Sequence, residues 1–232
     1  MDEISKNWTI MSLLGREIDI LANYPKTKRD LTVRREFKSK ESIKIAREFA
    51  KDYFDGDRRY GYGGFEYDSK FWQPVIPTLV ENYQLDNSSS VLDVGCAKGF
   101  LLYDLKLTFP EIHVSGIDIS EYAILNSKPE VKLDLQVGSA TALPFGNNSF
   151  DFVISINTIH NLEIQDCAKA LKEITRVSKG KSFITVDAYR NAEEKNRMEA
   201  WNLTALTMMS VDEWKNFFVE VGYTGDFYWF MP

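Results

Sequence analysis

Small residues follow an apolar run in the middle of the chain, at Val91–Phe100 (VLDVGCAKGF). Gly95, Ala97 and Gly99 alternate there with larger residues, and Asp93 precedes the first glycine by two positions. Small residues let a backbone approach a ligand closely, and the helix that follows offers free N–H groups. The segment therefore predicts a ligand-binding turn between a strand and a helix.

A second acid follows at about one strand–helix–strand spacing. Asp118 ends an apolar segment, where its carboxylate can accept two hydroxyl groups of a ligand. A helix cap is the alternative role, but Ser120 is the better N-cap at this point. We therefore expect Asp118 to bind a ligand.

Two further polar residues follow later apolar runs. His160 lies in Thr158–Leu162 (TIHNL), and histidine suits proton transfer near neutral pH. We expect it to act as a general base or to position the substrate; a hydrogen bond that fixes its loop is the alternative. Asp187 ends another strand and is a candidate substrate contact, with an ion pair to Arg190 as the alternative.

Strands and helices alternate from Ser90 onward and must position these residues. Strands are expected at 91–94, 113–117, 132–137, 150–156 and 182–187, and helices at 100–109, 120–127, 163–177 and 211–221. This alternation predicts an α/β fold with a doubly wound, mostly parallel sheet. We assign residues 78–232 to this ligand-binding domain and residues 1–77 to an N-terminal helical and lid segment.

The N-terminal segment differs from the rest of the chain in its residue spacing and composition. Ser39–Phe54 has helical spacing, and the loop 57–77 is rich in Gly, Tyr and Phe. Tyr62 and the other aromatic residues of the loop are costly to expose, and Arg58 and Arg59 could bind phosphate or carboxylate. We expect this loop to cover an acceptor, with Tyr62 at the reacting groups; a packed structural loop is the alternative.

Composition excludes several classes of protein. The 232 residues carry a net charge of −6, which disfavours nucleic acid as a partner. No apolar run could span a bilayer, and the polar stretch Met1–Trp8 does not resemble a signal peptide. The two cysteines, Cys96 and Cys167, are expected to be reduced thiols of a cytoplasmic protein, and no metal site is expected.

Together these motifs resemble class I methyltransferases that use S-adenosylmethionine (SAM), in particular their small-molecule branch. The segments that carry the resemblance are 93–99 (DVGCAKG), Asp118, 140–145 (ATALPF), 149–155 (SFDFVIS), 159–162 (IHNL) and 173–177 (EITRV). The resemblance covers residues 88–187 in detail and, more loosely, the helix expected at 211–221.

The resemblance implies SAM as the cofactor. Gly95, Ala97 and Gly99 would wrap its methionine part. Asp93 would hold this loop and face the positively charged end, while Asp118 would accept the ribose hydroxyls.

Four more residues have roles implied by the resemblance. Ile119 and Ala140 would sandwich the adenine. The backbone of Asn157 would lie near the methionine amino group, with an ordinary turn residue as the alternative. Ser139 stands where the family often has an acid, so its contact with the adenine would be weaker.

The loop before the core and the segment 201–205 (WNLTA) resemble, more loosely, methyltransferases of bacterial capsule and surface-polysaccharide biosynthesis. This resemblance implies an oxygen of a sugar or of a phosphorylated intermediate as the acceptor. In the family the sheet ends in a hairpin whose last strand is antiparallel, but Gly222–Pro232 has room for one strand or a very tight pair.

Two other functions remain open. One is a non-catalytic SAM-fold subunit that binds another protein. The other is a nucleotide-sugar or dinucleotide oxidoreductase, which predicts a GxGxxG loop near the start of the chain rather than after about ninety residues.

Overall fold

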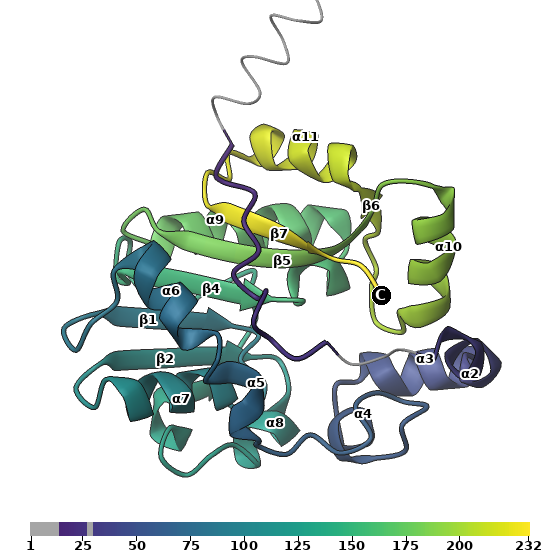
Figure 1. Cartoon of the computed structure of the whole chain (residues 1–232), viewed down its shortest axis with the longest axis horizontal. Helices are drawn as coiled ribbons and strands as arrows, with labels where there is room; N and C mark the ends of the chain where they lie inside the picture. Colours follow the sequence, from purple (N-terminus) through teal and green to yellow (C-terminus); the bar gives the residue numbers. More distant parts are fainter. Residues whose placement is uncertain (1–13, 27–29) are drawn as a thin grey trace, which may run out of the picture.

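The computed structural model describes residues 14–26 and 30–232, so Met1–Trp8 lies outside the described residues. The strands form one seven-stranded sheet in the order β3-β2-β1-β4-β5-β6, with β7 also paired to β5 (Figure 1). The strands are β1 (Ser90–Val94), β2 (His113–Asp118), β3 (Leu135–Val137), β4 (Phe152–Ile156), β5 (Ser182–Tyr189), β6 (Met209–Ser210) and β7 (Asp226–Phe230).

Helices cover both faces of this sheet. They are α2 (Leu31–Phe37), α3 (Lys40–Arg47), α4 (Lys51–Asp55), α5 (Ser69–Trp72), α6 (Ile76–Tyr83), α7 (Phe100–Thr108), α8 (Glu121–Leu125), α9 (Ile164–Val177), α10 (Ala192–Trp201) and α11 (Val211–Val221). Two short 3₁₀ helices, η1 (Lys132–Asp134) and η2 (Ile159–Asn161), complete the set. One apolar core lies under α9 and α11, and a second lies under α6 and α7. The predicted doubly wound fold is confirmed.

Two expected elements differ from the structure. The helix expected over 39–54 is two helices, because the chain bends at Phe49, whose φ is +48°. The Phe49 carbonyl accepts a hydrogen bond from the Ser120 hydroxyl, so a tertiary contact overrides the helical pattern. The strand expected over 132–137 is shorter, since η1 takes its first half and leaves Leu133 exposed.

The last strand runs parallel to its neighbour. β7 pairs with β5 from Phe183↔Asp226 to Asp187↔Phe230, and all strand pairings within the described residues are parallel. Helix α11 carries the chain from the carboxyl end of the strands back to their amino end. β7 therefore runs in the same direction as β5. The short C-terminal segment therefore forms a single strand in place of the family's hairpin.

The segment 16–18 lies along the other edge of β7. Ile18 donates its N–H to the Phe227 carbonyl at 3.0 Å, and Phe227 donates to the Arg16 carbonyl at 3.0 Å. Arg16 also pairs with Asp226 at 2.7 Å. From this strap the chain continues to α2, α3 and α4, which gather beyond the carboxyl ends of the strands, near α10 (Figure 1).

Candidate functional site

The turn between β1 and α7 is built from residues with left-handed backbones. Gly95, Ala97 and Gly99 have φ of +88°, +48° and +73°. The N–H groups of Gly95 and Cys96 both donate to the Ile117 carbonyl, at 2.7 and 3.0 Å. A Cβ on Gly95 would lie 2.0 Å from Thr158 Oγ1, so only glycine fits at this position.

Asp118 connects this turn to the end of β2. Its Oδ2 accepts from the Ala97 N–H at 2.7 Å, and its Oδ1 accepts from the Ser120 N–H at 2.8 Å. Burial raises the pKa of this carboxyl, and the two N–H donors oppose the shift. Each carboxylate oxygen has a further lone pair, so the group can accept ligand hydroxyls without losing its backbone contacts.

Asp93 lies beside Asp118 and is buried without a hydrogen-bond donor. Its residue is 6% exposed, and no described residue donates a hydrogen bond to its carboxylate. Burial, and then the charge of Asp118, raise its pKa to about 8. A buried acid without a partner is costly to ionise, and a nearby cation would offset that cost. The pair of acids therefore fits a ligand that carries both hydroxyl groups and positive charge.

The other predicted cofactor residues lie at the same edge of the sheet. Ile119 directly follows Asp118 and is 61% exposed. The Asp118 carbonyl accepts from the Gly138 N–H at 2.9 Å, which brings the segment with Ser139 and Ala140 alongside. Ser139 Oγ lies 2.8 Å from Thr141 Oγ1, so its hydroxyl is engaged within its own turn.

Asn157 follows β4 with a φ of +53°. Its N–H donates to the Thr185 carbonyl at 3.1 Å, and its Oδ1 accepts from the Thr185 hydroxyl at 2.9 Å. Its own carbonyl accepts from the Asn161 amide at 3.1 Å. The residue thus fixes the turn after β4, which favours the turn-residue alternative for its side chain while its backbone stays at the edge.

His160 is held on both ring nitrogens. Its Nδ1 accepts from the Asp187 N–H at 3.0 Å, and its Nε2 lies 3.4 Å from Asp187 Oδ1. Its carbonyl accepts from the N–H groups of Leu206 and Thr207, both at 3.0 Å. The residue is 2% exposed, and burial lowers its pKa although Asp187 opposes the shift. A neutral imidazole with both nitrogens engaged favours the loop-fixing role over that of a general base.

Asp187 is buried between three segments. Besides His160, its carboxylate accepts a hydrogen bond from the Asn202 amide, and its carbonyl accepts from the Trp214 indole at 2.9 Å. The sequence offered Arg190 as an ion-pair partner, but Arg190 instead lies 3.5 Å from Glu194. Through these hydrogen bonds Asp187 fixes η2 and the segment after α10 against the end of β5.

The lid segment is attached to the cofactor side of the sheet. Lys98, in the glycine-rich turn, donates to Asp55 Oδ2 at 2.7 Å and to the Phe65 carbonyl at 2.8 Å. The Tyr122 hydroxyl donates to the same Asp55 oxygen at 2.7 Å. The Phe65 ring stacks on Phe100 at the start of α7, with centroids 5.0 Å apart.

Tyr62 lies within this aromatic cluster, which packs on α7 and contacts the glycine-rich turn through Lys98. Its ring packs on Phe65 and Tyr53, with centroids 4.4 and 5.3 Å away. The residue is 45% exposed, so this side of the cluster faces solvent. The loop that carries Tyr62 thus lies on the same side of the sheet as the acids of β1 and β2, as the lid hypothesis requires.

The other end of the lid contacts α10 and the segment after it. Arg34 donates to the Trp201 carbonyl at 3.1 Å and to the Arg58 carbonyl at 3.0 Å. Both guanidinium groups lie over the Trp201 ring, 5.2 and 5.8 Å from its centroid. Arg59 pairs instead with Asp57 at 3.0 Å. Residues 34–65, part of the segment to which the lid hypothesis refers, therefore contact α8 at one end and α10 at the other.

Sequence reasoning missed several of these contacts. Lys98 stands inside the glycine-rich motif and Arg34 inside a basic run, so the sequence showed both charged residues but not their partners. Their partners Asp55 and Trp201 lie 43 and 167 positions away, and no local pattern connects them.

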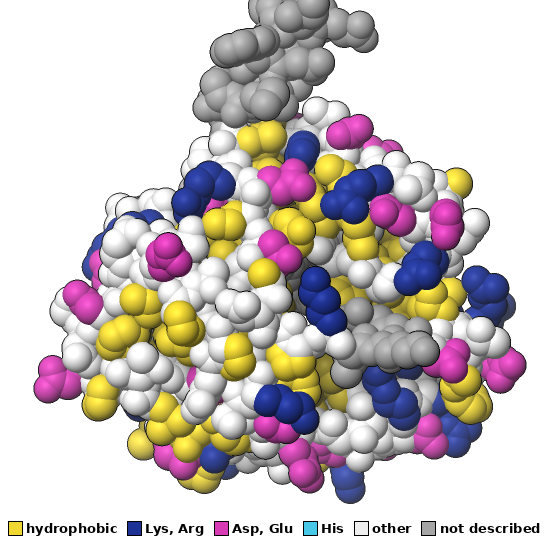
Figure 2. Space-filling view, viewed as in Figure 1, with side chains coloured by type: hydrophobic (Ala, Val, Ile, Leu, Met, Phe, Trp, Pro, Cys, Tyr) yellow, Lys and Arg dark blue, Asp and Glu magenta, His cyan; other side chains and the backbone are white. Residues whose placement is uncertain are grey.

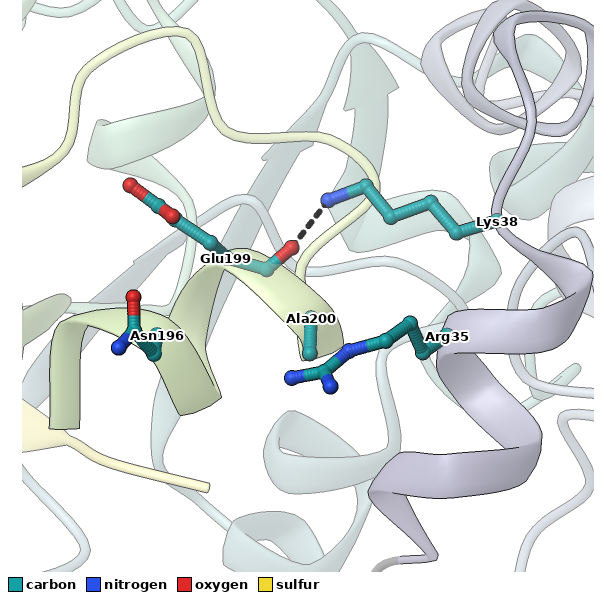
Figure 3. A pocket seen from close by; sticks show the side chains of 5 residues that line it. All are labelled: Arg35, Lys38, Asn196, Glu199 and Ala200. Carbon is teal, nitrogen blue, oxygen red and sulfur yellow. Dashed lines mark hydrogen bonds between the residues drawn. The ribbon is translucent and has the colours of Figure 1, made fainter. Parts of the chain in front are cut away.

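A separate cavity of about 490 Å³ opens between α2 and α10, lined by Arg35, Lys38, Asn196, Glu199 and Ala200 (Figure 3). None of the glycine-rich turn lines it, so it is distinct from the predicted cofactor site. Figure 3 shows Lys38 reaching the Glu199 carbonyl, while the Glu199 carboxylate points away.

No group of three or more His, Cys, Asp or Glu within the described residues could hold a metal ion. The described helices include none that is long and apolar enough to cross a membrane.

A family model described as a methyltransferase domain matches residues 85–222. The chain therefore belongs to this methyltransferase family, as its motifs predicted. An uncharacterized protein of Haemophilus influenzae is 28% identical over 158 residues, which cover 62% of each chain. A demethylmenaquinone methyltransferase of Symbiobacterium thermophilum is 36% identical over 126 residues, or 50% of this chain and 49% of that protein. The chain thus spans between about half and two thirds of the length of these relatives.

Among solved structures, an N-methyltransferase of Haemonchus contortus in complex with phosphomonomethylethanolamine and S-adenosylhomocysteine has a TM-score of 0.55. It is 18% identical, and the match covers 76% of this chain and 44% of that one. The likeness is one of fold.

Proposed function

We propose that this protein is a SAM-dependent methyltransferase that acts on a small molecule at the carboxyl edge of its sheet. The observation that carries the proposal is the pair of buried acids around the glycine-rich turn. Asp118 offers free lone pairs for two hydroxyls, and Asp93 lies buried without a donor from any described residue. SAM carries a ribose diol and a cationic methionine end, which match these two acids.

SAM would supply an activated methyl group, and the remaining work is to orient the acceptor and exclude water. The turn Gly95–Gly99 would hold the methionine part, and Ile119 and Ala140 would contact the adenine. Tyr62 and its aromatic neighbours would cover the acceptor. His160 and Asp187 would act as positioning residues, because they fix η2 and Asn202 around the edge.

Two acceptor classes follow from different observations. The looser sequence resemblance favours an oxygen of a sugar or of a phosphorylated intermediate. The relative from Symbiobacterium thermophilum is a demethylmenaquinone methyltransferase, which makes an uncharged quinone the second candidate.

The test combines binding with turnover. Calorimetry should detect binding of SAM and of S-adenosylhomocysteine to the wild type. Asp118→Ala should weaken both by tenfold or more, because a lost charge-assisted hydrogen bond is worth about 1.5–3 kcal/mol. Transfer of radiolabelled methyl groups to a panel of sugar, sugar-phosphate and quinone acceptors should then identify the substrate.

The controls separate the alternatives. Asp134→Asn changes an acid that pairs with Lys106 at 2.9 Å, away from the glycine-rich turn, and should leave cofactor affinity unchanged. Unchanged affinity in Asp118→Ala would contradict the cofactor assignment. Binding of SAM without transfer to any acceptor would favour the non-catalytic subunit, and binding of NAD without SAM would favour the oxidoreductase.

A further inference from the structure

Four cations meet where the lid touches the end of α10, and their direct partners are main-chain carbonyls. Besides the contacts of Arg34, Lys38 donates to the carbonyls of Glu199 and Asn202, and Arg47 donates to that of Ala205 at 2.8 Å. Arg58 donates to the Gly61 carbonyl. None of these four cations forms an ion pair with a carboxylate in residues 14–26 or 30–232. Figure 2 shows Lys, Arg, Asp and Glu side chains interspersed over one face of the molecule.

Capping of α10 accounts for only part of this arrangement. Cations near the carboxyl end of a helix are stabilised by its dipole, which corresponds to about half a negative charge. The Glu199 carboxylate adds one more charge, but it points away from Lys38 (Figure 3). Of the four positive charges, the dipole and Glu199 offset about one and a half, so about two and a half remain without a counter-charge from the described residues.

The cations also repel one another. Burial, and then the charge of Arg58, lower the pKa of Arg34 to about 10. Burial, then the charge of Arg34, also lower the pKa of Lys38, and Glu199 only partly opposes this. Other cations of the chain, such as Lys98 with Asp55 and Arg176 with Glu173, pair with an acid at 2.7 Å. An excess of this kind is relieved when an anion binds.

The cluster lies between the end of β5, at Asp187, and the aromatic cluster that contains Tyr62. Trp201, under both guanidinium groups, adjoins Asn202, which donates to Asp187 at the end of β5. On the other side, Arg58 donates to the Gly61 carbonyl, and the next residue, Tyr62, packs on Tyr53 and Phe65. A group bound here would therefore lie beside the acceptor position, not beside the cofactor's acids.

We propose that Arg34 and Arg58, stacked on Trp201, form an anion subsite that holds a phosphate group of the methyl acceptor. A phosphate monoester carries nearly two negative charges at neutral pH, which would offset most of the excess, and guanidinium groups bind it in a bidentate manner. The subsite rests on the proposed methyltransferase function for its role, and it makes the acceptor a phosphorylated molecule rather than a neutral quinone.

The test measures binding of inorganic pyrophosphate by calorimetry at constant ionic strength. The wild type should bind it, and Arg58→Gln should weaken binding about tenfold. Arg59→Gln is the matched control, because Arg59 is the next residue but pairs with Asp57. Arg58 is exposed, so its replacement should leave the fold intact even if Arg34→Gln does not.

Absence of pyrophosphate binding in the wild type, or equal weakening by Arg58→Gln and Arg59→Gln, would overturn the subsite. The same preparations are titrated with S-adenosylhomocysteine, whose affinity Arg58→Gln should not change. Pyrophosphate binding without S-adenosylhomocysteine binding would refute the proposed function and leave the anion subsite standing. The reverse result would refute the subsite alone.

Discussion

Main-chain groups hold a charged side chain both at the edge of the sheet and near the end of α10, but the main-chain groups are donors in the first region and acceptors in the second. At the edge, main-chain N–H groups of Ala97 and Ser120 hold Asp118. In the lid, main-chain carbonyls at the end of α10 hold Arg34 and Lys38. In both regions backbone dipoles fix charged side chains without neutralising them. The difference is that Asp118 and its N–H donors lie within one strand–helix–strand unit, whereas the cations and their carbonyl partners come from segments far apart in the sequence.

The largest effect is expected at the glycine-rich turn. Gly95→Ala places a Cβ 2.0 Å from Thr158 Oγ1 on a backbone with φ of +88°. Strain and overpacking each cost about 1–3 kcal/mol, so the midpoint of thermal unfolding should fall by roughly 10 °C. Gly222→Ala is the control, because Gly222 has a similar φ of +78° but nothing within 4 Å. Equal losses in the two variants would mean that the contact with Thr158 does not constrain the turn.

A pH-dependent effect is expected from Asp93. Its pKa in the folded state is about 8 against an ordinary 3.8, so the folded protein binds this proton more tightly than the unfolded chain does. Its contribution to the free energy of unfolding is complete below about pH 4 and is lost as the pH rises towards 8. Asp93→Asn should remove this loss, which amounts to a few kcal/mol.

Urea denaturation of the cofactor-free protein at pH 5 and pH 8 measures this effect. Asp151→Asn is the control, because hydrogen bonds from Ser90 and Lys179 lower the pKa of Asp151 to about 2. This carboxyl is ionised in both the folded and the unfolded state from pH 5 to pH 8, so its replacement should leave the difference in stability between the two pH values unchanged. The same pH dependence in Asp93→Asn and the wild type would show that Asp93 already has a counter-charge, and would remove the argument for a cationic ligand.

The smallest effect is expected in the lid, from Tyr62→Phe. The ring packs on Phe65 and Tyr53, and the change removes only a hydroxyl. One lost neutral hydrogen bond is worth about 0.5–1.5 kcal/mol, so stability should fall slightly and turnover by no more than about threefold. Thermal unfolding and the methyl-transfer assay measure the two quantities. Loss of turnover at unchanged stability would instead place the hydroxyl at the reacting groups, as the sequence hypothesis holds.

The sequence was informative where local chemistry determines structure. The end of β1 at Val94, the end of β2 at Asp118 and the turn at Gly95 follow from apolar runs, small residues and N-cap signals, and each lies at or within one residue of its predicted position. The fold class could be predicted for the same reason, because strand–helix alternation is a local pattern, and the family followed from the resemblance of its short motifs to those of known methyltransferases.

Contacts across the sheet could not be predicted in this way. The sequence offered His160 as a general base, a positioning residue or a loop-fixing residue, and Asp187 as a substrate contact or an ion-pair partner of Arg190. Their mutual contacts depend on β4 and β5 being neighbours, and these residues are 27 positions apart. The break at Phe49 likewise depends on Ser120, which is distant in sequence.

The strap at 16–18 has a consequence for the order in which the molecule assembles. Arg16 and Asp226 are separated by 210 positions, so bringing them together closes almost the whole chain into a loop. The entropy lost in closing a loop grows with its length, and contacts of this kind are gained late unless the intervening chain is already compact. The glycine-rich turn, by contrast, joins residues within one strand–helix–strand unit. During refolding, the ligand-binding edge of the sheet should therefore form before residues 16–18 pair with β7.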